Sequence, residues 1–150
     1  LPDRDALLAE AARLLAARAG AGRPIALLAL GVDHMARVNA GAGRLLGDAL
    51  LQRVAEVLSR RTRASDVVAR AGGDVFLVLL PDVAADEASR MAERLRVAAG
   101  HALAPALEVT VSAGVRAAAV DGATAEALVD AALAALAAAK AARRDRVAAG

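Results

Sequence analysis

An uninterrupted apolar run at residues 25–32 constrains the fold more than any other feature of the chain. The run follows Pro24, reads Ile-Ala-Leu-Leu-Ala-Leu-Gly-Val and is too short for a second helix. A segment of this kind is typical of a central β-strand that is covered on both faces. The chain therefore needs other elements on both sides of a sheet, and its 150 residues suit a single domain with a genuine core.

Helical periodicity recurs along the rest of the chain. Apolar residues three and four positions apart predict helices at residues 5–19, 45–63 and 86–99, with Gly100 ending the third. Residues 39–43 have the composition of a turn, and Thr124 is a good N-cap for a last helix.

Two further patterns indicate strands. Short β-prone runs at residues 67–70 and 75–80 flank a Gly-Gly turn, which predicts a hairpin. Residues 107–119 alternate between apolar and polar positions, so one face of that strand is expected in the core and the other to be polar. The predicted fold is α+β, with a central, mainly antiparallel sheet flanked by helices.

Composition excludes several functions. The chain has no Cys and one aromatic residue, Phe76, which excludes a disulfide framework, a cysteine zinc site and a base-stacking platform. Its 19 basic and 17 acidic residues are spread along the chain, so no nucleic-acid partner is expected. No apolar run approaches the ~18 to 20 residues that span a bilayer. The start lacks the pattern of a signal peptide, so we expect a cytoplasmic domain cut from a longer signalling protein.

Taken alone, the segment at residues 70–76, Arg-Ala-Gly-Gly-Asp-Val-Phe, is explained as a hairpin turn whose Gly-Gly pair is structural. However, it resembles the signature turn of the GGDEF family, the diguanylate cyclases that condense two GTP molecules into cyclic di-GMP. Further segments resemble the family in the same order, namely residues 1–4, 32–39, 47–51, 110–115 and 139–144. The resemblance implies one GGDEF domain over residues 1–150, with a nucleotidyl-cyclase-like fold.

The resemblance also identifies what is missing. In the family, metal-binding carboxylates come from the end of the first strand and from the third and fourth positions of the turn. Here the first of these positions is Gly31 and the last is Val75, so only Asp74 remains. Asp33 matches the second acid of the family segment and not the metal-binding one. We expect a degenerate cyclase without activity or cofactor, with Mg²⁺ only if residual GTP binding persists.

Other positions of the family's GTP pocket are kept. These remnants are the guanine-reading pair Asn39 and Asp48, the glycines Gly72 and Gly73, and the phosphate-binding pair Lys140 and Arg144. Several neighbours depart from the family, namely Ala36, Ala40, Ala42, Arg44, Leu133, Ala137 and Arg143. The alternative interpretation makes Asn39 a turn residue and Asp48 a charge near a helix N-terminus.

A second site is expected nine residues before the turn. Arg63 and Asp66 match the family's inhibitory Arg-x-x-Asp motif, in which the Arg clamps guanine and phosphate of cyclic di-GMP and the Asp accepts from the guanine edge. Arg94 matches a further arginine that contacts the bound ligand dimer, and Arg90 or Arg96 replaces it if the helix is phased differently. The structural alternative is a solvated helix end with a weak ion pair.

Four functional hypotheses follow. The leading one is an inactive GGDEF module that senses cyclic di-GMP through Arg63, Asp66 and Arg94. The second is a GTP-binding allosteric domain that controls a linked phosphodiesterase of the EAL type. The third is a dimerisation or partner-docking module, which includes a homodimer, and residual cyclase activity is the fourth.

Overall fold

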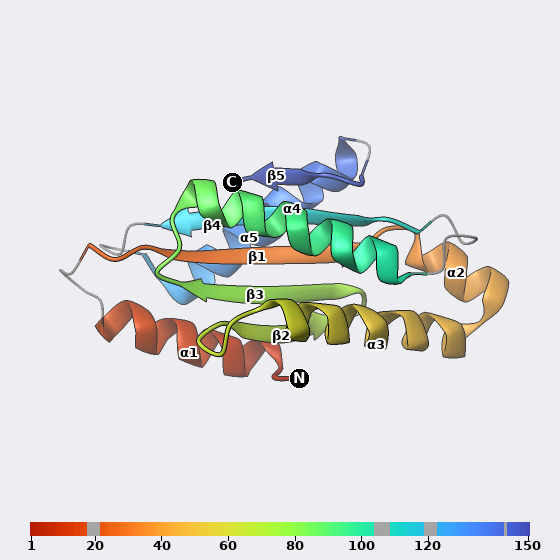
Figure 1. The fold of residues 1–150 in the computed structure, drawn as a ribbon, viewed down its shortest axis with the longest axis horizontal. Helices are drawn as coiled ribbons and strands as arrows, with labels where there is room; N and C mark the ends of the chain where they lie inside the picture. Colours follow the sequence, from red (N-terminus) through yellow and green to blue (C-terminus); the bar gives the residue numbers. More distant parts are fainter. Residues whose placement is uncertain (18–21, 104–108, 119–122, 143) are drawn as a thin grey trace.

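The centre of the computed structural model is a five-stranded sheet. The structure describes residues 1–17, 22–103, 109–118, 123–142 and 144–150. The strands are β1 (Ile25–Val32), β2 (Val67–Gly72), β3 (Val75–Pro81), β4 (Val111–Ala118) and β5 (Val147–Ala149). Their order is β2-β3-β1-β4-β5 (Figure 1), and every described pairing is antiparallel except that of β5 with β4. The mainly antiparallel sheet predicted from the sequence is confirmed.

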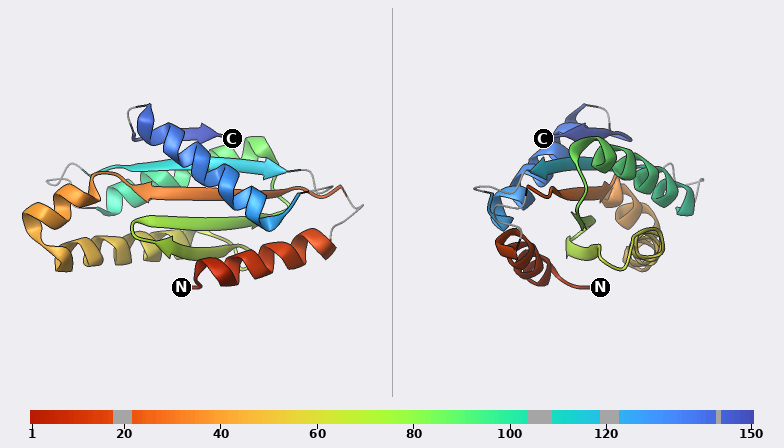
Figure 2. Two further views of the ribbon diagram at one scale, coloured as in Figure 1. Left: turned by 180° about the vertical axis from the view of Figure 1, so that it is seen from behind. Right: turned by 60° about the vertical axis from the view of Figure 1, so that its left-hand side comes forward.

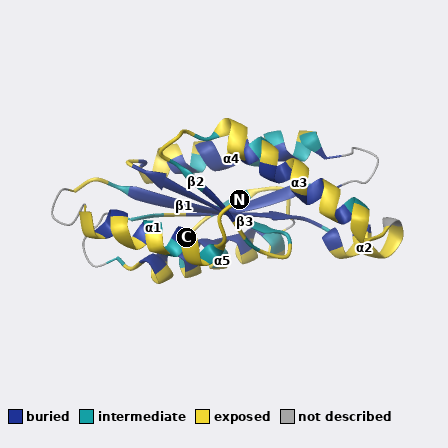
Figure 3. Ribbon diagram, turned by 90° about the horizontal axis from the view of Figure 1, so that it is seen from below, coloured by how far each residue is buried: buried dark blue, intermediate teal, exposed yellow. Residues whose placement is uncertain are grey.

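Helices cover both faces of the sheet. They are α1 (Arg4–Ala17), α2 (Met35–Ala42), α3 (Arg44–Arg61), α4 (Ala85–Ala102) and α5 (Ala125–Ala141). α3 and α4 lie over one face, and α1 and α5 lie over the other (Figures 2 and 3). Among the described residues, no helix is both long and apolar enough to cross a membrane.

The central strand divides its side chains between the two helical layers. Every residue of β1 is buried, as the apolar run predicts. Leu28 and Leu30 belong to the core under α3 and α4, while Ile25 and Leu27 belong to the core under α1 and α5. This alternation follows from the period of two along a strand, and it explains why no polar residue is tolerated in the run.

Helix α2 corrects the expectation of a turn at residues 39–43. Met35 and Val38 are buried in the core, which stabilises a helix of only two turns that the sequence pattern does not reveal. The chain enters α2 through His34 in the left-handed conformation, at φ 65°, and leaves it through Gly43 at φ 90°. Gly43, the last residue of the expected turn, therefore ends the helix, because a positive φ favours glycine.

Strand β4 corrects the expectation of one polar face. Residues 111–115 are all buried, because α4 packs on one face of the strand and α5 on the other. Gly114 makes the second contact possible: a Cβ atom there would lie 2.2 Å from the backbone nitrogen of Leu136 in α5. The predicted strand positions 107, 108 and 119 lie outside the described residues.

The ends of two other elements also differ from expectation. α4 continues through Gly100 to Ala102, because glycine in a helix costs only about 1 kcal/mol and does not force an end. β5 was not expected, since three residues give no periodic pattern; it forms because β4 leaves a free edge beside it. Thr124, in contrast, caps α5 as predicted by accepting a hydrogen bond from the Ala127 N–H at 3.1 Å.

The hairpin of β2 and β3 is confirmed with its glycine turn. Gly72 and Gly73 have φ angles of 119° and 55°, and no atom lies within 4 Å of the Cβ that either position lacks. The backbone conformation alone therefore requires glycine at this exposed tip. Because Gly31 pairs with Val75, the tip lies beside the end of β1.

Candidate functional site

One edge of the sheet brings the hairpin tip and the last turn of α5 to the end of β1. The Val32 N–H donates to the carbonyl of Asp74 at 3.2 Å. The Lys140 ammonium group, from α5, donates to the carbonyl of Val32 at 3.3 Å. Asp33 and Asp74 therefore lie on the same side of the domain, as the resemblance implied.

The side chain of Asp33 is the centre of a hydrogen-bond network at this edge. Its carboxylate is fully buried and accepts from the hydroxyl of Thr110 at 2.6 Å and from that of Ser112 at 2.9 Å. The Asp145 N–H also donates to it, at 3.2 Å, and donates to the Ser112 hydroxyl at 3.0 Å. The network joins the end of β1 to β4 and to the segment that leads into β5.

Two cations balance this buried carboxylate. The Lys140 nitrogen lies 3.4 Å from an Asp33 oxygen, and the Nε of Arg144 lies 3.9 Å from the same oxygen. A carboxylate removed from water needs such partners, because an isolated buried charge is strongly unfavourable. Lys140 and Arg144 are both held at Asp33, but not as neighbours on one helix: α5 ends at Ala141, and Arg144 lies beyond it with φ 58°.

The glycine at the end of β1 determines how closely Lys140 approaches. A Cβ atom on Gly31 would lie 2.9 Å from the Cε and 3.3 Å from the nitrogen of Lys140. The lysine side chain therefore lies in the space that a side chain at position 31 would enter.

The residues at this edge do not fit a divalent metal ion. Within the described part of the chain, no three His, Asp or Glu side chains gather into a group that could hold one. Val75 stands where a second turn acid is needed, and the Asp33 carboxylate already accepts several hydrogen bonds. Asp74 is the one acid left at the three family positions, and a Mg²⁺ site with a single carboxylate has to rely on water and substrate phosphates for its other ligands.

The proposed guanine-reading pair lies on adjacent helices. Asn39 is exposed on α2, and Asp48 is exposed near the start of α3. A Cβ atom on Gly47 would lie 2.1 Å from the Oδ1 of Asn39, so the Asn39 amide packs directly over Gly47. Gly47 therefore acts as a positioning residue for Asn39, which the sequence alone did not single out.

Arg63 and Asp66 bind each other through both side-chain and backbone contacts. The Asp66 side chain has no exposed surface and binds the Arg63 guanidinium at 2.9 Å and the Arg63 backbone N–H at 2.8 Å. Arg63 also donates to the carbonyl of Pro81 at 3.0 Å, and half of its side chain remains exposed. The hydrogen bond that Arg63 donates to the Asp66 carboxylate raises the pKa of Arg63. Asp66 thus positions Arg63, and accepting from a guanine edge would require one of its oxygens to be released.

The two candidate sites lie at opposite ends of strand β3. Arg63 contacts Pro81, which pairs with Ile25 at the start of β1, whereas Val75 pairs with Gly31 at its end. Seven residues of strand separate the two sites, or about 20 Å at ~3.3 Å per residue. Changes at one site are therefore expected to leave the other intact.

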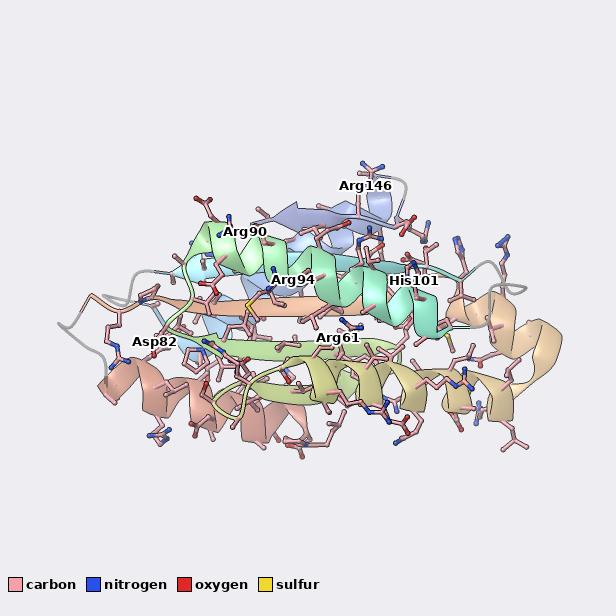
Figure 4. All side chains as sticks on the ribbon, in the orientation of Figure 1. Arg61, Asp82, Arg90, Arg94, His101 and Arg146 are labelled. Atoms are coloured by element: carbon pink, nitrogen blue, oxygen red, sulfur yellow. The ribbon has the colours of Figure 1, made fainter. Side chains whose placement is uncertain are left out.

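Arg94 shares a hollow with an arginine from the neighbouring helix. Arg61 of α3 and Arg94 of α4 line a pocket of about 290 Å³ together with Met91 and Leu95 (Figure 4). Arg61 lines this pocket and Arg63 does not; the sequence alone leaves Arg61 as either part of a solvated helix face or part of an anion site. Because the two arginines lie on different helices, no pattern in the sequence indicates that they line the same pocket.

Arg90 and Arg96, the two alternatives to Arg94, differ in their exposure to solvent and in their ion pairs. Arg90 is exposed on the same helix. Arg96 is only 12% exposed and is bound by Glu93 at 2.6 Å and by Asp145 on the β5 side. Arg96 is therefore committed to holding α4 against the chain before β5.

A further hollow lies beside the hairpin tip. The N-terminal residues 1–5 and the turn residues 70–73 line an open cavity of about 540 Å³. The Arg70 N–H donates to the carbonyl of Pro2 at 3.0 Å, and the Arg70 guanidinium donates to the carbonyl of Gly73 at 2.7 Å. Arg70 thus ties the start of the domain to the glycine turn.

The chain belongs to the GGDEF family: residues 1–146 match the family described as "Diguanylate cyclase, GGDEF domain". The diguanylate cyclase DgcP of Pseudomonas aeruginosa is 38% identical over 121 residues, which cover 78% of this chain and 18% of that protein. The response regulator PleD of Caulobacter vibrioides is 38% identical over 116 residues, which cover 71% of this chain and 25% of that protein. The chain thus spans a quarter or less of the length of these relatives.

Solved structures agree with the fold. The GGDEF domain of DgcB from Caulobacter crescentus, in complex with c-di-GMP, superposes with a TM-score of 0.89 at 29% identity and covers 99% of this chain and 91% of that one. The diguanylate cyclase SiaD from Pseudomonas aeruginosa, in complex with its activator SiaC, gives 0.90 at 31% identity, covering 100% and 59%. The expected fold is confirmed, and catalysis and ligands of this chain are matters for experiment.

Replacing Asp33 tests its structural role. Asp33→Ala leaves the Thr110 and Ser112 hydroxyls and the Lys140 charge without their partner, so we expect the free energy of unfolding to fall by about 3 to 5 kcal/mol. Asp48→Ala removes an exposed carboxylate and should change it by less than about 0.5 kcal/mol. Urea denaturation followed by circular dichroism measures both. Equal stabilities of the two variants would contradict the central role of Asp33.

Proposed function

We propose that this GGDEF domain is catalytically inactive and binds cyclic di-GMP at an inhibitory-type site formed by Arg63, Asp66 and Arg94. The contrast between the two ends of β3 carries the proposal. At one end two of the family's three metal-binding acids are absent, while at the other Arg63 is held by Asp66 and by the Pro81 carbonyl. The proposal concerns this domain, because the relatives that match it are much longer.

The loss of activity is argued from the chemistry of phosphoryl transfer. Attack of a ribose hydroxyl on an α-phosphate needs divalent metal ions that neutralise the phosphates and lower the pKa of the nucleophile. Those ions need carboxylate oxygens, which Gly31 and Val75 do not provide. Neither Asp74 nor the buried Asp33 replaces both missing acids.

A conversion assay tests this part of the proposal. The protein incubated with GTP and Mg²⁺ should form no cyclic di-GMP, because two metal-binding acids are missing. Product is measured by chromatography, with an active diguanylate cyclase as the positive control. Turnover of ~1 per second or faster, within the range usual for enzymes, would show that the domain is a working cyclase.

Ligand binding is argued from the state of Arg63. A guanidinium group offers a planar fork of donors that suits phosphate and the guanine edge. Asp66 accepts from the Nε and Nη2 of Arg63, Pro81 accepts from Nη2, and half of the Arg63 side chain is exposed. Arg61 and Arg94 add two positive charges on the adjacent helices, and no ion pair involving either is found among the described residues. A doubly anionic cyclic dinucleotide matches this charge.

Calorimetric titration of cyclic di-GMP tests the binding site. Arg63→Ala should weaken binding at least about tenfold, or ~1.4 kcal/mol, because it removes charged hydrogen bonds. Asp66→Ala should also weaken it, because Arg63 loses the carboxylate that positions it, and Asp66→Asn should restore part of the affinity. Arg94→Ala is expected to have a smaller effect.

Two variants serve as controls for this titration. Lys140→Ala removes a cation at the other end of β3 and should leave cyclic di-GMP affinity unchanged. Arg116→Ala removes an exposed arginine of β4, so a loss of affinity there would indicate only general charge attraction. If the wild-type protein shows no saturable binding at ~10 μM, where the binding free energy is about 7 kcal/mol, the sensor proposal is wrong.

The Asn39 site favours a second candidate function, a GTP-binding domain that regulates a linked EAL phosphodiesterase. Asn39 packs over Gly47 next to Asp48, which brings an amide and a carboxylate together on an exposed surface. These groups can bind the donor and acceptor edge of guanine. GTP titration should then show binding that Asn39→Ala and Asp48→Ala each weaken, while Gln52→Ala, an exposed change farther along α3, leaves it intact. Binding of neither nucleotide would favour a docking or dimerisation module.

A further inference from the structure

Lys140 occupies the place that the missing strand-end acid of β1 leaves open. Because Gly31 has no side chain, the lysine extends until a Cβ atom at position 31 would lie 2.9 Å from its Cε. A larger residue at position 31 would push this flexible side chain away. The glycine at position 31, where the family has an acid, therefore makes room for the Lys140 side chain.

The ammonium group is fixed on its inner side. It donates to the Val32 carbonyl at 3.3 Å and lies 3.4 Å from the buried Asp33 carboxylate. An ammonium group carries three donors, so these two contacts leave one donor. The Lys140 side chain is 26% exposed, which leaves that donor a path to a ligand in solution.

The charges at this edge favour an anion. Among the side chains paired with the Asp33 carboxylate, Lys140 and Arg144 contribute two positive charges against its one negative charge, and the nearby Asp145 carboxylate is paired with Arg96. The side chain of Arg144 is 44% exposed and lies on the same carboxylate. A metal ion would add to the positive charge here and would find few free oxygen ligands, whereas a phosphate group would be attracted.

We propose that Lys140 serves as a built-in cation in place of the divalent metal, so that this edge holds the phosphates of a guanine nucleotide without a metal ion. Lys140 and Arg144 contact the phosphates. Gly31 leaves the space that the Lys140 side chain occupies at the end of β1. The inference rests on the second candidate function, the retained guanine-nucleotide site of Asn39 and Asp48. It is independent of cyclic di-GMP binding at Arg63.

Titration of GTP in EDTA and in Mg²⁺ tests the proposal on the wild-type protein. We expect the two dissociation constants to agree within about threefold, or ~0.7 kcal/mol, because no protein-bound metal contributes. Binding that occurs only with Mg²⁺ would overturn the built-in cation and keep the guanine-nucleotide site. Absence of binding under both conditions would overturn both, and the cyclic di-GMP titration would still stand.

Two variants make the test specific to Lys140. Lys140→Met keeps the length of the side chain without its charge and should weaken GTP binding in EDTA at least about tenfold, or ~1.4 kcal/mol. Arg116→Met, the matched loss of an exposed charge on β4, should have no effect. Equal effects of the two variants would show that net charge alone attracts the nucleotide and would overturn the proposal.

Gly31→Asp gives the sharpest contrast, and it covers the case in which Lys140→Met does not fold. The new side chain would push Lys140 from its present place, and its carboxylate would offset the lysine charge, so GTP affinity in EDTA should fall about tenfold, or ~1.4 kcal/mol. Restoring the family's acid would thus impair the site. Unchanged affinity in EDTA, together with a gain when Mg²⁺ is added, would mean that the edge still accepts a metal ion and would overturn the proposal.

Discussion

The buried Asp33 carboxylate is the interaction on which the functional edge of this domain depends. It receives the hydroxyl groups of Thr110 and Ser112, the backbone of Asp145 and the charge of Lys140. These partners come from β4 and the residue just before it, from the segment before β5 and from α5, so one side chain joins elements that are far apart in the sequence. A carboxylate without solvent contact must be satisfied in this way, because the cost of an unpaired buried charge exceeds that of most other defects.

The absence of one acid has changed this edge without leaving a void. Gly31 admits the Lys140 side chain, whose charge lies beside Asp33 and whose packed stem fills the space. Close packing explains the arrangement, since a void at the end of a buried strand loses contact energy. The glycine at the end of β1 and the lysine of α5 thus form one packed unit, and our proposal for this edge depends on that packing.

The sheet separates two sites that the sequence places close together. Arg63 precedes the glycine turn by nine residues, yet it contacts Pro81 at the far end of β3. The antiparallel hairpin runs out to the tip and back, so positions near each other in sequence lie a strand length apart (Figure 1). A change at one end of β3 therefore need not disturb the side chains at the other end.

The sequence alone determined the central strand, the glycine hairpin, four of the helices and the family. These features depend on local periodicity, on the φ angles that only glycine adopts easily, and on short motifs. It did not reveal α2, β5 or the two-sided burial of β4, because each depends on what packs against it. The contact of Arg63 with the Pro81 carbonyl, the sharing of one hollow by Arg61 and Arg94, and the approach of Lys140 to Gly31 were decided only by the tertiary structure. Contacts between residues distant in the chain leave no periodic signal, since they arise from the close packing of one element on another.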